Sequence, residues 1–208
     1  GSLPGDLHKL WRARHPSQYH LDYGFSTMGY EIAGGLGVKM ADPAREVYVL
    51  VGDGSYLMLS NEIITSIQEN LKLTIILMDN RGYKSIGSLS RSLGQEGFGT
   101  RYAYTSDEGQ VASDESASPR DLPVDLAMNA RSMGACVMEC KSRDEFVKAL
   151  QAAKEVAYTT VIYVQNDRYL GVPGYSWWDV PPAEVSEMPS VQAKRKDWEV
   201  MRAKERDY

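Results

Sequence analysis

The sequence has few cysteines and no apolar run long enough to cross a membrane. Its two cysteines, Cys136 and Cys140, are four residues apart in a strand-like run, so both side chains point to one face. Such a lone pair does not make a zinc site, and a disulfide along one strand has poor geometry. We therefore expect buried, reduced thiols. No secretory signal opens the sequence, which favours a cytoplasmic protein that does not enter membranes.

Excess positive charge is also lacking, because 23 Lys and Arg stand against 28 Asp and Glu, for a formal net charge of −5. Sequence-independent nucleic-acid binding needs clustered Lys and Arg that displace counterions, so we expect no nucleic-acid partner. The global charge does not exclude a local site for an anionic ligand. Hydrophobic residues make up 43% of the 208 residues, which suits one well-buried globular domain.

Several catalytic and nucleotide-binding motifs are missing. Neither Gly52 nor Gly35 begins a complete G-x-G-x-x-G pattern, so the dinucleotide-binding motif is not present. No Lys-Ser or Lys-Thr pair follows a glycine loop, and no G-x-S-x-G segment supplies a serine nucleophile. We assign surface or structural roles to the three histidines, which all lie near the start of the chain: His8, His15 and His20.

The chain does contain an alternation of strand-like and helix-like segments, which predicts an α/β fold. Short, mostly apolar runs predict strands at 46–51, 73–78, 135–139 and 159–164. Runs of this kind are typical of parallel strands that are covered on both faces. Apolar spacing predicts helices at 30–40, 60–70, 124–133 and 144–156. The expected fold is therefore a three-layer one, a parallel sheet with helices on both faces.

Some helix ends and helix contacts can also be predicted. Ser60 is the expected N-cap of the helix at 60–70. Ser142 and Glu145 fit a capping box ahead of the helix at 144–156. Within the helix at 30–40 we expect three glycines to permit close packing: Gly34, Gly35 and Gly37.

Two regions interrupt the alternation. Residues 81–123 are rich in Gly, Ser and charge, and we expect a long functional loop there. Residues 191–208 are highly charged with few apolar anchors, which predicts a charged tail or a marginal helix. We therefore expect a main domain over 1–190 and a tail over 191–208.

Residues suited to a metal site follow the first two predicted strands. Asp53 and Asn80 each stand just past a strand, with one helix between them, and ligands of parallel α/β sheets bind at that edge. Mg²⁺ prefers hard oxygen ligands and often shares them with phosphates, so we assign it the two side chains and the Gly82 carbonyl. Gly54 and Ser55, ahead of a helix, would donate to phosphate. The alternative is that both segments are simple turns.

The spacing of Gly52-Asp53-Gly54 and Asn80 resembles the cofactor motif of thiamine-diphosphate enzymes related to acetolactate synthase and pyruvate decarboxylase. That resemblance implies thiamine diphosphate and Mg²⁺ as cofactors. Segment 23–30 (YGFSTMGY) is similar to the part of this family that meets the aminopyrimidine ring. It implies that Met28 holds the cofactor bent and that the Ser26 carbonyl faces its 4′-amino group. Core packing is the alternative role for Met28.

The resemblance has one departure near the metal site. The family often has Asn-Asn where this chain has Asp79-Asn80. The residue expected to bind the metal is still Asn80, so the departure leaves the predicted ligand set unchanged.

Further segments resemble one branch of this family, the trihydroxycyclohexanedione hydrolases: 3–11, 23–37, 98–100, 175–178 and 183–186. This implies an enzyme that opens the ring of a cyclic polyol diketone by C–C bond hydrolysis during myo-inositol breakdown. Two alternatives stay open. One is an acetolactate-synthase-like ligase or 2-oxoacid decarboxylase, and the other is a non-catalytic binding module that keeps the fold.

The resemblance also implies that an essential glutamate comes from a separate pyrimidine-binding domain, usually of a second subunit. No segment of this chain resembles that domain. We therefore expect no catalytic residue within these 208 residues, and we expect the chain alone to be inactive. A homodimer or homotetramer is expected for the whole enzyme.

Overall fold

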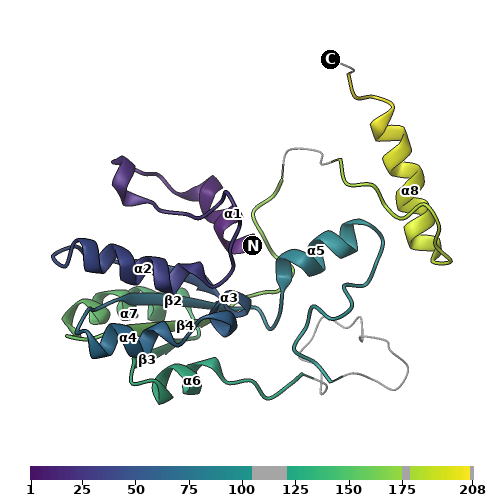
Figure 1. Ribbon diagram of the computed structural model, residues 1–208. Helices are drawn as coiled ribbons and strands as arrows, with labels where there is room; N and C mark the ends of the chain where they lie inside the picture. Colours follow the sequence, from purple (N-terminus) through teal and green to yellow (C-terminus); the bar gives the residue numbers. More distant parts are fainter. Residues whose placement is uncertain (105–120, 175–178, 207–208) are drawn as a thin grey trace. The chain divides into compact units, whose positions relative to one another are not determined.

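The structure is a computed structural model that describes residues 1–104, 121–174 and 179–206 (Figure 1). Contacts between residues divide the chain into two compact units, which are described separately. Unit 1 comprises Gly1–Gly82 and Pro123–Arg168, and unit 2 comprises Tyr83–Leu122 and Tyr169–Tyr208. Residues 105–120 of the expected loop and the aromatic segment 175–178 lie outside the described residues.

Unit 1 is built on a four-stranded parallel sheet with the strand order β1-β2-β4-β3. The strands are β1 (Tyr48–Gly52), β2 (Thr74–Asp79), β3 (Cys136–Cys140) and β4 (Thr160–Gln165). Each overlaps a predicted apolar run, and β2 and β4 occupy the centre of the sheet. All four predicted strands and their parallel arrangement are confirmed.

Helices cover both faces of this sheet. They are α1 (Ser2–Leu10), the 3-10 turn η1 (Pro16–Gln18), α2 (Tyr30–Ala41), α3 (Asp53–Met58), α4 (Glu62–Gln68), α6 (Leu126–Ser132) and α7 (Arg143–Glu155). In one buried cluster, α2, α4 and α6 pack with strand residues that include Val161 of β4. In a second cluster, α7 packs against Ile162, the next residue of the same strand. Successive strand residues face opposite sides, so the predicted three-layer α/β fold is confirmed.

Two of the three glycines in α2 allow the close packing that we expected. A Cβ atom on Gly35 would lie 2.4 Å from Val49 Cγ2, so glycine lets α2 approach β1 closely. A Cβ on Gly34 would lie 2.6 Å from the Tyr30 ring. Gly37 has nothing within 4 Å of such an atom, so the expectation was wrong there.

The expected caps are only partly correct. Helix α4 begins at Glu62 with Asn61 as its N-cap, and no side chain caps it. Ser60 contributes only its carbonyl, which accepts from Ile63 N at 3.1 Å, because the chain is already helical at Asn61. Ser142 does cap α7, accepting from Glu145 N at 3.2 Å. The Glu145 carboxylate accepts from the backbone N of Lys141, not from that of the N-cap Ser142 as a capping box requires.

Unit 2 has two helices among its described residues, α5 (Lys84–Ser92) and α8 (Pro189–Arg202). Helix α5 lies in the segment that we expected to be a loop, so that expectation fails over 84–92. A Cβ on Gly87 would lie 2.7 Å from Thr100 Oγ1, so this glycine lets α5 pack on the chain that follows it. Helix α8 confirms the helix expected in the tail, and its Val191 is buried.

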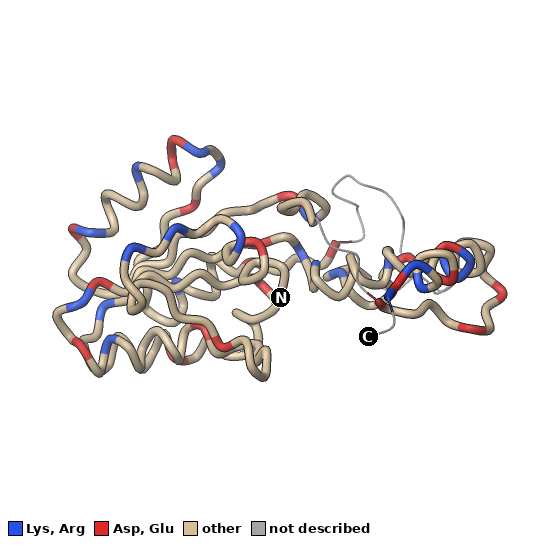
Figure 2. The backbone as a smooth tube through the Cα atoms, turned by 90° about the horizontal axis from the view of Figure 1, so that it is seen from above, with Lys and Arg blue, Asp and Glu red and all other residues tan. Residues whose placement is uncertain are grey.

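Expectations from composition hold in part. Both cysteines are free; Cys140 is buried, but Cys136 is only half-buried because it begins the edge strand β3. No helix in the described part of the chain has the length and apolar character of a membrane span. Figure 2 shows basic and acidic residues interspersed along the backbone, including along α8.

Candidate functional site

Asp53 lies at the carboxyl end of β1, where α3 begins, and its side chain is buried. One carboxylate oxygen accepts from Gly54 N at 3.0 Å, and the other accepts from Gly82 N at 2.8 Å. Gly82 is 29 residues further along the chain, in the loop after β2. This bond brings the ends of the neighbouring strands β1 and β2 together, as expected for a parallel sheet.

Asn80 follows β2 directly, and its side-chain oxygen is buried without a hydrogen-bond donor among the described residues. A buried amide oxygen with no partner costs free energy, and most such groups in proteins are satisfied. A buried amide oxygen of this kind suits a hard divalent cation, which would supply the missing partner. Asn80, Asp53 and the Gly82 backbone therefore form a donor set that fits Mg²⁺.

A second carboxylate, that of Asp79, lies against Asp53. Asp79 is buried at the end of β2, and it accepts from Arg81 N at 2.8 Å and from the Tyr163 hydroxyl at 2.6 Å. Burial raises the pKa of Asp53 to about 7; the hydrogen bond from Gly82 opposes this, and the Asp79 charge adds to it. Two carboxylates that share one buried space in this way disfavour their joint ionisation.

The same carboxylate affects Tyr163 on β4. Burial raises the pKa of its hydroxyl, and the hydrogen bond to Asp79 raises it further. Tyr163 therefore stays a neutral hydrogen-bond donor at physiological pH, and Asp79 is its acceptor.

Helix α3 carries the two residues assigned to phosphate. Gly54 and Ser55 are both buried, and the Gly54 N–H donates to the Asp53 carboxylate. Helix α3 is held in place by Tyr56, whose buried hydroxyl donates to Asn129 Oδ1 at 2.8 Å. A phosphate at this position would have to share the Gly54 N–H with Asp53.

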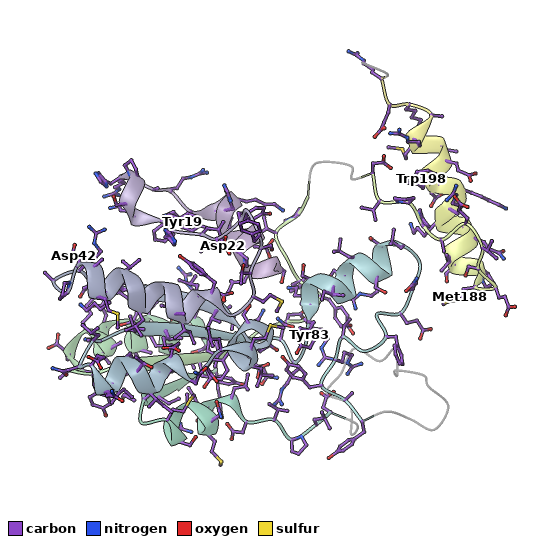
Figure 3. All side chains as sticks on the ribbon, viewed as in Figure 1. Tyr19, Asp22, Asp42, Tyr83, Met188 and Trp198 are labelled. Carbon is purple, nitrogen blue, oxygen red and sulfur yellow. The ribbon has the colours of Figure 1, made fainter. Side chains whose placement is uncertain are left out.

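The segment assigned to the aminopyrimidine ring packs against the end of α3. Gly29 has a φ of +89°, and a Cβ there would lie 3.1 Å from Leu59 Cβ. Ser26 is exposed and also left-handed, with a φ of +52°, while Met28 is half-buried. Thr27 N donates to the carboxylate of Asp22, which Figure 3 labels, at 3.4 Å. Among the described residues, the Asp53 carboxylate accepts hydrogen bonds from Gly54 and Gly82 and not from Ser26 or Met28.

The three histidines make local contacts, as expected for structural roles. His15 Nδ1 accepts from Ser17 N and caps η1. The His8 ring lies edge-on to Tyr19, labelled in Figure 3, and to a neighbouring tyrosine. His20 Nε2 is hydrogen-bonded to the Tyr30 hydroxyl. None of these contacts involves the residues around Asp53.

Sequence reasoning missed Asp79 and Tyr163 as parts of this site. Asp79 was noted only as a departure from a motif, and Tyr163 lies within an apolar strand with no motif of its own. The described residues hold no group of three or more His, Cys, Asp or Glu side chains able to bind a metal. A site built from one carboxylate, one amide and a carbonyl does not need such a group.

Similar proteins place this geometry in a family. Residues 1–164 match the model of the C-terminal TPP-binding domain of thiamine pyrophosphate enzymes. The chain is 42% identical over 194 residues to 3D-(3,5/4)-trihydroxycyclohexane-1,2-dione hydrolase 2 of Bacillus cereus. A 3D-(3,5/4)-trihydroxycyclohexane-1,2-dione hydrolase of Bacillus anthracis matches at 42% over the same length. Both alignments cover 93% of this chain and 29% of the relative.

Solved structures agree on the fold. A thiamine diphosphate-dependent 4-hydroxybenzoylformate decarboxylase of Rhodococcus jostii RHA1 superposes with a TM-score of 0.52 at 21% identity. The superposition covers 67% of the present chain and 23% of the decarboxylase chain. A benzoylformate decarboxylase from Polynucleobacter necessarius superposes with a TM-score of 0.51 at 21% identity. This match covers 70% of the present chain and 25% of the decarboxylase chain.

The chain thus spans less than a third of the length of the curated relatives it matches. More than two thirds of each relative's sequence lies outside the matched region. With four parallel strands, flanking helices and a family match over most of its length, the chain belongs to the thiamine pyrophosphate enzymes, as their C-terminal cofactor-binding domain.

Proposed function

We propose that this chain binds the diphosphate and Mg²⁺ of thiamine diphosphate in a hydrolase that opens a cyclic 1,2-diketone ring by breaking a C–C bond. The observation that carries the metal part is the buried Asn80 oxygen, which has no donor among the described residues and lies in the loop whose Gly82 N–H binds the Asp53 carboxylate. The similarity to trihydroxycyclohexanedione hydrolases supports the substrate class, a cyclic polyol diketone.

In this proposal the metal is held by the side chains of Asp53 and Asn80 and by the Gly82 carbonyl. A divalent cation there favours the ionised form of Asp53, which the metal-free site disfavours because burial raises its pKa. Gly54 and Ser55, both buried at the start of α3, would donate to the diphosphate. When bound, the cofactor supplies the nucleophilic carbon for C–C cleavage, and this chain binds and orients it.

The aminopyrimidine end of the cofactor would lie near segment 23–30. The Ser26 carbonyl is assigned to its amino group, and Met28 is assigned to hold the bent conformation. The packing of Gly29 against Leu59 supports this, because it places the segment beside the helix that begins with Asp53.

The rest of the active site would come from outside this chain. A pyrimidine-binding domain, from a second subunit of a homodimer or homotetramer, would supply the activating glutamate. The chain would therefore be inactive alone, with residues 1–190 as the cofactor-binding domain and 191–208 as a charged C-terminal segment that includes most of helix α8. Turnover by the isolated 208 residues would contradict this arrangement.

Calorimetric titration of the full-length protein with thiamine diphosphate, with and without Mg²⁺, tests the proposal. Binding should require Mg²⁺, and Asp53→Ala should weaken it by at least about 100-fold, since it removes a direct ligand. Asp42→Ala is the matched control, because the Asp42 side chain is 46% exposed and forms an ion pair with Arg45. Wild-type affinity in Asp53→Ala would refute the metal assignment. Release of an open-chain acid from a cyclic diketone, but not from 2-oxoacids, tests the reaction class.

A further inference from the structure

Tyr163 lies next to the candidate metal site without belonging to any motif. Its hydroxyl, on β4, donates to Asp79 Oδ2 at 2.6 Å, although the two residues are 84 apart in the chain. In the sheet register Tyr163 pairs with Leu77, and Asp79 is two residues further along the same face of β2. The bond therefore joins the carboxyl ends of the two central strands.

The other oxygen of Asp79 shapes the loop that follows. Oδ1 accepts from Arg81 N at 2.8 Å, a side-chain to backbone bond across two residues that stabilises a tight turn. Asn80 is inside this turn and Gly82 is directly after it. The Asp79 carboxylate thus sets the backbone path of two of the three proposed metal ligands.

This turn needs support because its backbone is strained. Arg81 has a φ of +64°, a left-handed conformation that is unfavourable for residues other than glycine. Its guanidinium donates to Val124 O at 3.0 Å and lies 3.8 Å from Asp79 Oδ2. Asn166, which directly follows β4, donates its backbone N–H to the Asp79 carbonyl at 2.8 Å. The main chain of Asp79 is therefore held from this neighbouring strand end as well.

We propose that Tyr163 is a positioning residue, which orients the Asp79 carboxylate so that the turn presents Asn80 Oδ1 and the Gly82 carbonyl to a divalent cation. This inference rests on the proposed function. Tyr163 contacts neither the cation nor the cofactor and acts only through Asp79. Without the hydroxyl, the Asp79 carboxylate would lose a donor on one oxygen and rotate away from Arg81 N.

Tyr163→Phe is the sharpest test, because it keeps the buried ring and removes only the hydroxyl. Loss of partners that orient metal ligands typically weakens metal binding about 10–100-fold. In the full-length protein at saturating thiamine diphosphate, we expect the half-saturating Mg²⁺ concentration to rise by about that factor. Excess Mg²⁺ should restore full cofactor binding, which a general loss of structure would not allow.

Ser66→Ala is the matched control. Ser66 is buried in α4, and its hydroxyl bonds to the Ile63 carbonyl and to Thr159 Oγ1 at 2.8 Å each. Thr159 immediately precedes β4, so this bond lies at the opposite end of the strand from Tyr163. Ser66→Ala should lower the metal-free melting temperature yet leave the Mg²⁺ requirement within about twofold. Equal shifts in both variants would overturn the positioning role.

A double-mutant cycle with Asp79→Asn shows whether Tyr163 acts through Asp79. Asp79→Asn keeps an oxygen for Arg81 N and removes the charge, so Tyr163→Phe should matter less in that background. Equal effects of Tyr163→Phe in both backgrounds overturn the inference, while normal Mg²⁺-dependent binding in the wild type preserves the proposed function. A wild type that binds no cofactor with Mg²⁺ overturns both. Where Tyr163→Phe does not fold, Asp79→Ala takes its place: it removes the acceptor for Arg81 N and should raise the half-saturating Mg²⁺ concentration about 10–100-fold, and an unchanged value would overturn the inference.

Discussion

Replacing Asp53 by Asn probes the most perturbed carboxyl group of unit 1. Burial raises the pKa of Asp53 to about 7, against the hydrogen bond from Gly82 and with the help of the Asp79 charge. Asparagine has nearly the same shape and does not titrate. One of its two polar atoms cannot accept from Gly54 or Gly82, so the variant loses one hydrogen bond at every pH. The stability difference between wild type and Asp53→Asn contains this loss at every pH. Its change with pH therefore reports the titration of Asp53 alone.

The expected magnitude follows from the two pKa values. An aspartate of the unfolded chain titrates near 3.8, so between about pH 4 and 7 the folded chain keeps a proton that the unfolded chain has released. The folded pKa is raised, so the stability from this group is complete below pH 3.8 and is lost as the pH rises through 7. Each pH unit in this window is worth about 1.4 kcal/mol. Because the folded group is half-deprotonated at pH 7, the wild type should lose about 2 kcal/mol relative to Asp53→Asn from pH 5 to pH 7.

Thermal unfolding in EDTA at about pH 5, 6, 7 and 8 measures this difference. For a chain of this size, a stability difference of about 2 kcal/mol corresponds to a relative shift of about 4–8 °C in the melting temperature between pH 5 and pH 7. Asp42→Asn is the control for the loss of an aspartate from unit 1, because the Asp42 side chain is 46% exposed at the end of α2. A difference between wild type and Asp53→Asn that is flat with pH would refute the raised pKa and the description of the metal-free site.

Four further predictions concern the site and the fold. Mg²⁺ with thiamine diphosphate should stabilise the protein more at pH 7 than at about pH 5, because the metal requires ionised Asp53; equal thermal shifts would contradict this. Asn80→Ala should change metal-free stability by less than about 1 kcal/mol, since its oxygen has no donor in the part of the chain that the structure describes, yet weaken Mg²⁺-dependent binding about 100-fold in calorimetry. In urea unfolding, Gly35→Ala should cost about 1–3 kcal/mol, because its Cβ meets Val49 at 2.4 Å. Gly37→Ala, where the space is open, should instead stabilise by about 0.5–1 kcal/mol.

The strands could be predicted because they are buried on both faces. A central parallel strand such as β2 must be apolar at almost every position, and its sequence shows this without reference to its neighbours. Helices α3 and α5 were not predicted, because the sequence of each gives a weak local helix signal. Helix α3 is only six residues long and begins inside the Gly-Asp-Gly motif, and α5 is rich in Ser and Gly. Both depend on packing between distant segments, which local propensity does not report.

The site could be predicted where chemistry and strand ends coincide. Asp53 and Asn80 stand out because oxygen-bearing residues follow two consecutive apolar runs. The bond between Tyr163 and Asp79 could not be predicted, because it depends on β4 lying beside β2. The sequence contains the four strands in the order one to four, and nothing local indicates that the last is inserted between the second and the third. The roles of Asp53 and Asn80 as metal and cofactor ligands stay predictions.

Several unfavourable features of the metal-free site would be compensated by a single divalent cation. Asp53 and Asp79 place two carboxyl groups in one buried space, and the Asn80 oxygen is buried without a donor among the described residues. Each feature alone destabilises the fold, and the chain keeps all of them within one turn after β2 and one helix start after β1. A divalent cation between them would neutralise the carboxylate charge and give the amide oxygen its partner. Cofactor binding and the stability of unit 1 should therefore be linked, so that removal of the metal loosens the turn at 79–82 before the rest of the sheet.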